Sequence, residues 1–168
     1  MVYSREEIKF QSSDGKNTVF GEINLPEGTP RAVIQISHGM IDHIGRYTPL
    51  VEYLLGRGFA VAGNDHLGHG KTAASEKDFG YFAKKDGYKL VVDDLKRMND
   101  LLHERFKDIP VFLLGHSMGS FIARWALTEY KDAWDAAVIS GTAGPEAPTG
   151  AGKLLCRVLG LFGKHNRY

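Results

Sequence analysis

The sequence of 168 residues predicts an α/β protein in which a mostly parallel sheet carries helices on both faces. Two observations lead to this class. Short apolar runs typical of buried strands alternate with longer segments whose apolar residues recur at helical spacing, which favours parallel pairing. One apolar run, residues 111–114, leads directly into Gly-His-Ser-Met-Gly, residues 115–119, the pattern of a strand, a sharp turn and the start of a helix.

Local patterns predict each element in turn. Residues 6–11 and 18–25 are expected to form a hairpin that begins the sheet, because the Ser-Ser-Asp-Gly segment between them is a turn sequence. Further strands are expected at 32–37, 59–63, 111–114 and 136–140. Helices are expected at about 47–55, 88–106 and 118–130. The second helix has one apolar stripe, formed by Val91, Leu95, Met98, Leu102 and Phe106. The third has apolar residues at helical spacing, namely Phe121, Ile122, Trp125 and Ala126.

Composition and charge exclude several classes. A hydrophobic content of 43% is enough for a core, and the length suits one domain. A net charge of +1, from 21 basic and 20 acidic residues, provides no field that would gather nucleic acid. The single cysteine, Cys156, excludes an internal disulfide, and the charged N-terminus is unlike a signal peptide, so we expect a cytoplasmic protein. No apolar run approaches the roughly 20 residues that span a bilayer, and any membrane contact would be peripheral.

The segment around Ser117 predicts a nucleophile elbow. Glycines at 115 and 119 permit a turn too tight for larger side chains, and such a turn holds the serine hydroxyl clear of the sheet. Ser117 is therefore the candidate nucleophile for attack on a carbonyl. His116, its neighbour, is expected to be a packing residue rather than the catalytic base.

A second strand end is expected to supply an oxyanion hole. Residues 32–40 form an apolar run that ends in His38-Gly39-Met40. In a fold with an elbow, the hole takes one backbone N–H from such a loop and one from the residue after the nucleophile. These positions are Met40 and Met118, and Gly39 lets the backbone turn its amides toward the site.

At this point the motifs resemble a known family. The segment HGMIDHIGRYTPLVEYLLGRGFAVAGNDHLGHGKT, residues 38–72, followed by VFLLGHSMGS, residues 111–120, is similar to the monoacylglycerol lipase and lysophospholipase branch of the α/β-hydrolases, which is serine aminopeptidase S33-like. The similarity covers about residues 7–144. It implies the α/β-hydrolase fold, a Ser-Asp-His hydrolase with a mobile lid, a lipid-like ester substrate and no cofactor. The sequence departs from the family at Met40, where a small residue is usual.

The acid and the base that the family implies are expected beyond residue 168. In α/β-hydrolases they follow the nucleophile in the order acid and then histidine, each after a later strand. Downstream of Ser117 only one strand, 136–140, is readable, so the core is expected to stop after its sixth strand. The acids there, Asp132, Asp135 and Glu146, and the histidine, His165, are not expected to complete the triad. An open edge at 136–140 would also favour self-association.

Two parts are expected in the chain. Residues 1–144 would be the N-terminal part of the hydrolase core, and 145–168 the start of a lid over the acyl site. Leu155 and Leu159 belong to an apolar stripe that is expected to contact substrate, although simple core packing is the alternative.

The histidines raise the question of a metal. His66 and His69 are three residues apart, but Gly68 and Gly70 make this segment a turn, and no carboxylate or cysteine cluster completes a ligand set. We therefore expect no metal and no cofactor. The alternative that we favour is that Asp65 and His66 tie their loop by hydrogen bonds beneath the oxyanion segment.

Three functional hypotheses remain open. The complete protein is expected to be a carboxylic ester hydrolase for a monoacylglycerol or lysophospholipid, with this chain alone inactive. The second hypothesis is another enzyme on the same elbow, such as a thioesterase, a peptidase or an acyltransferase. The third is a non-catalytic fragment or binding module.

Overall fold

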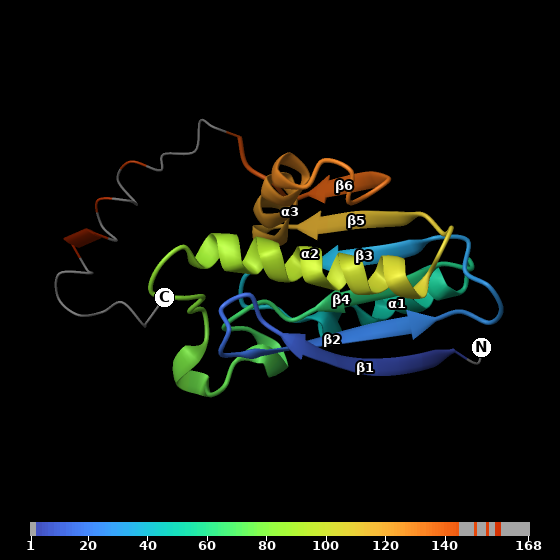
Figure 1. Cartoon of the computed structure of the whole chain (residues 1–168), viewed down its shortest axis with the longest axis horizontal. Helices are drawn as coiled ribbons and strands as arrows, with labels where there is room; N and C mark the ends of the chain where they lie inside the picture. The colour runs from blue at the N-terminus through green and yellow to red at the C-terminus, as the bar shows by residue number, and fades with distance from the viewer. Residues whose placement is uncertain (1–2, 145–149, 151–153, 155–156, 159–168) are drawn as a thin grey trace.

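The computed structural model describes residues 3–144 together with 150, 154, 157 and 158. It has one mixed sheet of six strands in the order β1-β2-β4-β3-β5-β6 (Figure 1). The strands are β1 (Ser4–Gln11), β2 (Thr18–Leu25), β3 (Val33–Ser37), β4 (Ala60–Asn64), β5 (Val111–His116) and β6 (Ala136–Ser140). The helices are α1 (Thr48–Leu55), α2 (Gly87–Arg105) and α3 (Met118–Glu129), with short 3-10 turns η1 (Ile44–Tyr47), η2 (Gly70–Thr72) and η3 (Glu76–Asp78).

Strand pairing brings the two predicted motifs, at residues 38–40 and 115–119, to the same end of the sheet. β1 and β2 form the predicted hairpin, β2 is antiparallel to β4, and the pairs β4–β3, β3–β5 and β5–β6 are parallel. The register places Ser37 opposite Gly115, and His116 opposite Ser140. Since the carboxyl ends of parallel strands share an edge, the loop after β3 lies beside the turn after β5.

Helices cover both faces of the sheet, as predicted (Figure 1). One apolar cluster lies between the sheet and α2 with α3, and it includes the complete stripe predicted on α2. A second cluster lies between the sheet and α1, and contains Ile36, Ile44, Val51 and Leu55. The two clusters bury the sheet from both sides. Polar side chains of the sheet can therefore reach solvent mainly where the strands end.

Buried polar groups fasten α2 to the rest of the core. Gln35 on β3 is fully buried, and its side chain donates to the carbonyl of Leu95 at 2.8 Å and accepts from the indole N–H of Trp134 at 2.8 Å. At the hairpin turn, Ser12 Oγ donates to Asp94 at 2.7 Å. Such bonds satisfy polar atoms that would otherwise be costly to bury.

The third helix differs from the pattern predicted for it. Ile122 and Ala126 are buried, but Phe121 and Trp125 are 49% and 46% exposed. Trp125 contacts Tyr88 edge to face, with ring centroids 5.0 Å apart. Helical spacing identified an apolar face wider than the surface that α2 and the sheet cover within the described part of the chain.

Most of the predicted lid segment, 145–168, lies outside the described residues, and so do Leu155 and Leu159. Two neighbours within it, Leu154 and Val158, are exposed.

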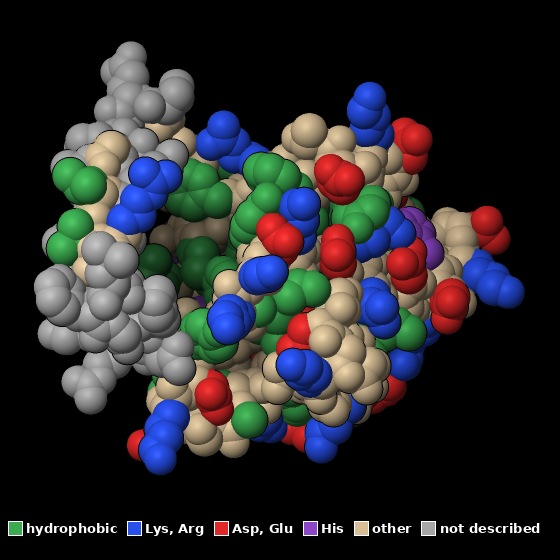
Figure 2. All heavy atoms as spheres, turned by 60° about the vertical axis from the view of Figure 1, so that its left-hand side comes forward, with side chains coloured by type: hydrophobic (Ala, Val, Ile, Leu, Met, Phe, Trp, Pro, Cys, Tyr) green, Lys and Arg blue, Asp and Glu red, His purple; other side chains and the backbone are tan. Residues whose placement is uncertain are grey.

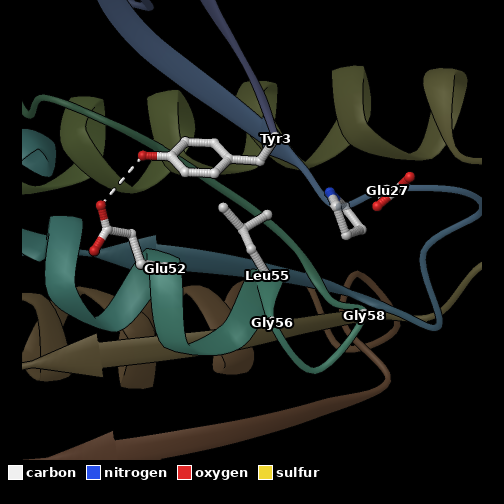
Figure 3. A pocket seen from close by; sticks show the side chains of 7 residues that line it. Tyr3, Glu27, Glu52, Leu55, Gly56 and Gly58 are labelled. Atoms are coloured by element: carbon white, nitrogen blue, oxygen red, sulfur yellow. Dashed lines mark hydrogen bonds between the residues drawn. The ribbon is translucent and has the colours of Figure 1, made fainter. Parts of the chain in front are cut away.

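A groove of about 500 Å³ lies at the amino ends of the parallel strands, lined by Tyr3, Leu55 and Gly58 among others (Figure 3). The phenol of Tyr3 donates to Glu52 at 3.3 Å across it. This groove is at the end of the sheet opposite to Ser117. Tyr3 precedes Ser4, which pairs with Leu25 at the end of β2, and the end of β2 lies beside the start of β4.

Candidate active site

Ser117 occupies the turn between β5 and α3 in a backbone conformation that few L-residues adopt. Its φ is 51° and its ψ is −120°, and it is the N-cap residue of α3. Its N–H donates to the carbonyl of Ser140 on β6 at 2.9 Å, and its carbonyl accepts from the N–H of Ser120 at 2.9 Å. These two hydrogen bonds hold the strained conformation of Ser117, whose side chain lies at the carboxyl end of β5.

Close packing explains both glycines of the predicted elbow. A Cβ on Gly119 would lie 2.0 Å from the carbonyl oxygen of Ser37, because α3 begins against the end of β3. A Cβ on Gly115 would lie 2.7 Å from Cβ of Ala123. The tight strand–turn–helix expected around Ser117 is present, and its glycines are required by contact rather than by flexibility.

The loop after β3 lies directly against the nucleophile. A Cβ on Gly39 would be 3.3 Å from Cβ of Ser117 and 3.6 Å from the carbonyl oxygen of His116. Met40 follows in this loop with its side chain 65% exposed. Met118 opens α3, where the first backbone N–H groups have no partner within the helix. Gly39, Met40, Ser117 and Met118 are thus neighbours at one edge.

A buried histidine orients the peptide that would supply the first oxyanion donor. The N–H of His66 donates to Nε2 of His38 at 2.9 Å, so the proton of the neutral imidazole is assigned to Nδ1. That nitrogen then donates to the carbonyl of Gly39 at 2.8 Å. In a trans peptide the N–H of Met40 points away from this carbonyl, and so away from the buried imidazole.

Burial keeps the histidines beneath this loop neutral. Desolvation lowers the pKa of His38 to about 4 and the pKa of His66 well below its ordinary value. Their ring centroids are 4.2 Å apart with the ring planes tilted by 39°, and the ring centroid of His69 lies 5.4 Å from that of His38. Neither imidazole hydrogen-bonds to Ser117: both ring nitrogens of His38 bind backbone groups of Gly39 and His66, and Nε2 of His66 lies against Ser37 Oγ.

The predicted role of Asp65 and His66 is confirmed by their hydrogen bonds. Asp65 accepts from the N–H of Ile44 at 2.8 Å and from the N–H of Lys71 at 2.7 Å. His66 Nε2 lies 3.1 Å from Ser37 Oγ. The turn after β4 thus braces the loop after β3, and among the described residues no cluster of three or more histidine, cysteine or acidic side chains could hold a metal ion.

The prediction that His116 packs in the interior is wrong. Its side chain is exposed, with Nδ1 3.4 Å from Ser140 Oγ. It is the last residue of β5 and the one exposed residue of that strand. It flanks Ser117 without a hydrogen bond to it.

The candidate acids Asp132 and Asp135 lie away from Ser117. Asp135 accepts from the N–H of Val111, the first residue of β5, at 2.8 Å, which places it at the far end of the strand from Ser117. Asp132 is exposed in the turn before it. Glu146 and His165 lie outside the described part of the chain.

One feature of the site has no sequence signal. Ile41, next to Met40, has φ of 54° and is 85% exposed. A β-branched residue is the least expected type in this conformation, so no pattern in the sequence points to it.

The doubly covered sheet, the strained serine after β5 and the adjoining glycine loop define an α/β-hydrolase. Comparison with known proteins narrows the class: a family model described as Serine aminopeptidase, S33, matches residues 28–167. The chain belongs to this family, in its monoacylglycerol lipase-like branch.

Three relatives show the extent of the similarity. Human (Homo sapiens) monoglyceride lipase is 35% identical over 139 residues, which cover 81% of this chain and 44% of the human protein. Monoacylglycerol lipase of Mycolicibacterium smegmatis is 28% identical over 164 residues, covering 96% and 55% of the two chains. The crystal structure of a thermostable carboxyl esterase from Bacillus coagulans, in complex with glycerol, superposes with a TM-score of 0.85 at 32% identity, covering 96% of this chain and 52% of that one. The chain therefore spans about half the length of these relatives.

Proposed function

We propose that the complete protein is a carboxylic ester hydrolase that acts on a lipid-like ester, such as a monoacylglycerol or a lysophospholipid, through an acyl-enzyme on Ser117. The observation that carries the proposal is the close approach of Gly39 to Ser117, where an added Cβ would lie 3.3 Å from Cβ of the serine, because it brings a strained serine and an oriented loop peptide together. The names of the relatives support a lipid ester as substrate.

The geometry supports a division of roles. Ser117 Oγ would attack the ester carbonyl, and the N–H groups of Met40 and Met118 would stabilise the negative charge that develops on its oxygen. A histidine and an acid from outside the described residues would accept the serine proton and pass it to the leaving alcohol. Water would then attack the acyl-enzyme in the same way and release the carboxylic acid product and free Ser117.

The side of the molecule at the carboxyl ends of the parallel strands carries both hydrophobic and basic side chains. Figure 2, which turns the carboxyl ends of the strands forward, shows hydrophobic side chains between lysine and arginine side chains. No helix within the described residues is long and apolar enough to cross a bilayer. We propose contact with lipid from the surface only, by a cytoplasmic protein.

The test replaces the nucleophile in the active protein. Ser117→Ala should lower kcat for p-nitrophenyl butyrate by at least about 10³-fold with an unchanged circular dichroism spectrum, because no other group can form the acyl-enzyme. Ser75→Ala, an exposed serine in the loop after β4, is the matched control and should leave kcat unchanged. Activity retained in Ser117→Ala would contradict the proposal.

Substrate profiling separates the alternatives on the same fold. A thioester, a peptide p-nitroanilide and a monoacylglycerol should be compared at equal concentration, and we expect the highest kcat/KM for the monoacylglycerol. Failure of a fluorophosphonate to label Ser117 in the folded protein would favour a non-catalytic module instead.

A further inference from the structure

The turn at Met40 and Ile41 combines backbone strain with exposed apolar side chains. Ile41 has φ of 54°, a region in which a β-branched side chain is crowded against its own backbone. Glycine or asparagine adopts such a turn position readily, whereas isoleucine does so only when its surroundings impose it.

Both flanks of the turn are fixed by hydrogen bonds. On one side the carbonyl of Gly39 accepts from His38 Nδ1 at 2.8 Å. On the other, the N–H of His43 donates to the Asp42 carboxylate at 2.9 Å, and the N–H of Ile44 donates to Asp65 at 2.8 Å. The conformation at Ile41 is therefore imposed by its neighbours, and the strain is a consequence of having isoleucine there.

Packing does not account for isoleucine at this position. Its side chain is 85% exposed, and that of Met40 is 65% exposed. Ile44, three residues later, is 2% exposed and packs in the apolar cluster between the sheet and α1. Isoleucine at 41 thus costs backbone energy and adds nothing to the core that the described residues form.

The position of the turn suggests what the two side chains meet. Gly39 lies so near Ser117 that an added Cβ would be 3.3 Å from Cβ of the serine, and Met40 and Ile41 are one and two residues from this closest approach to the nucleophile. An ester whose carbonyl oxygen reaches the N–H of Met40 must extend its substituents past these side chains. Of the two ends of a lipid-like ester, only the acyl chain is apolar enough to gain from them.

We propose that Met40 and Ile41 form an apolar lip that contacts the acyl chain of the substrate and favours longer chains. The inference rests on the proposed ester hydrolase function and assigns a specificity role to Ile41. Loss of the isoleucine side chain removes apolar contact with the substrate and, at the same time, relieves the backbone strain.

The experiment compares p-nitrophenyl acetate with p-nitrophenyl decanoate, both below their aggregation concentrations, in the active protein. Ile41→Gly should lower kcat/KM for the decanoate about tenfold more than for the acetate, a ratio worth ~1.4 kcal/mol and so less than two methylene groups of contact. Its Tm should equal or exceed that of the unsubstituted protein, because glycine tolerates the positive φ.

Two controls isolate the apolar contact. Ile41→Val keeps a β-branched apolar side chain and should hold the decanoate to acetate ratio within about fourfold, since it removes one methylene, worth about 0.8 kcal/mol. Tyr53→Ala removes a 55% exposed apolar side chain from α1 and should leave the ratio unchanged.

The outcomes distinguish the lip from the function beneath it. An unchanged ratio in Ile41→Gly, or an equal loss on both esters, overturns the lip while the hydrolase stands. The decanoate is also assayed above its aggregation concentration. A loss that appears only there overturns the lip as well, in favour of contact with a lipid surface. If the complete protein without substitutions hydrolyses neither ester, the proposed function itself fails.

Discussion

At the residue scale, the candidate site depends on backbone groups more than on side chains. Ser117 keeps an unfavourable φ and ψ, at a cost of about 1–3 kcal/mol, because Ser140 and Ser120 bind its N–H and its carbonyl. His38 contributes in the same indirect way, since its imidazole fixes the direction of the Gly39 carbonyl. Such groups bring no charge to the ester, but they decide where the amides point.

The buried histidines predict a stability that falls in acid. Burial lowers the pKa of His38 from 6.5 to about 4, so between these values the unfolded chain binds a proton that the folded chain does not. The free energy of unfolding should therefore fall as the pH drops from 6.5 toward 4, and this contribution should level off below that.

Thermal unfolding across this pH range provides the measurement. His38→Asn keeps an amide that can donate to Gly39 and removes the titrating group, so its Tm should fall less with acid than that of the unsubstituted protein. His43→Gln, at an exposed histidine of the same loop, should fall as the unsubstituted protein does. Parallel Tm profiles for His38→Asn and the unsubstituted chain would contradict this account.

At the scale of elements, the site is the meeting of β3, β5 and the first turn of α3. The helix starts so close to β3 that Gly119 has no room for a side chain, because an added Cβ would overlap the carbonyl of Ser37. Separation of the helix from β3 would also move the N–H of Met118 relative to the loop peptide.

Gly119→Ala should therefore destabilise the fold and impair the site together. The added methyl meets backbone atoms, which cannot rotate away, and overpacking of this kind costs about 1–3 kcal/mol or more. Urea unfolding gives the loss of stability, and the rate of fluorophosphonate labelling at Ser117 gives the effect on the site. Gly144→Ala, where a Cβ meets nothing within 4 Å, is the control; equal stability of the two variants would show that α3 can shift without cost.

Sequence periodicity predicted an element well where turn residues, glycine or proline mark both of its ends. Strands β2 and β6 have the bounds expected for them, and the predicted helix at 88–106 corresponds to α2 at Gly87–Arg105. Periodicity failed on the outer face of α3, because a list of apolar positions does not say how many neighbours will cover them.

The site was predictable in its motifs but not in its strain or its completion. Glycines at 115 and 119 signal close packing, and the structure shows the contacts that require them. The positive φ at Ile41 lies between a bond from His38 to the Gly39 carbonyl and a bond from the Ile44 N–H to Asp65, and Asp65 is too distant in sequence for a local pattern at residue 41 to reveal it. The acid and base of a triad, and the roles of Met40 and Met118, stay predictions.

At the scale of the whole molecule, the described fold leaves apolar surface on one side. Strand β6 pairs with β5 alone within the described residues, and Val138 on it is 59% exposed. Phe121 and Trp125 on the adjoining α3 are about half exposed as well. Open strand edges beside apolar surface favour pairing with another chain.

Residues 1–168 expressed alone should show no ester turnover and should self-associate. Turnover should be absent because no described histidine bonds to Ser117, and a serine without its base is a weak nucleophile. Light scattering on a sizing column measures the mass, and Val138→Lys should shift it toward the monomer by placing charge at the edge. A monomer whose ester turnover is lost in Ser117→Ala would instead make His165, with Asp132, Asp135 or Glu146, a candidate partner.

The hydrogen bond from the Ser117 N–H to the Ser140 carbonyl joins the nucleophile to the least protected strand of the sheet. Its amide hydrogen can exchange with solvent deuterium only when that bond opens, and opening requires β6 to separate locally from the elbow. The exchange rate at this one amide is thus a direct readout of how firmly the sheet edge is held. A slower rate on adding a second polypeptide would report that the edge has been covered, even when no substrate is turned over.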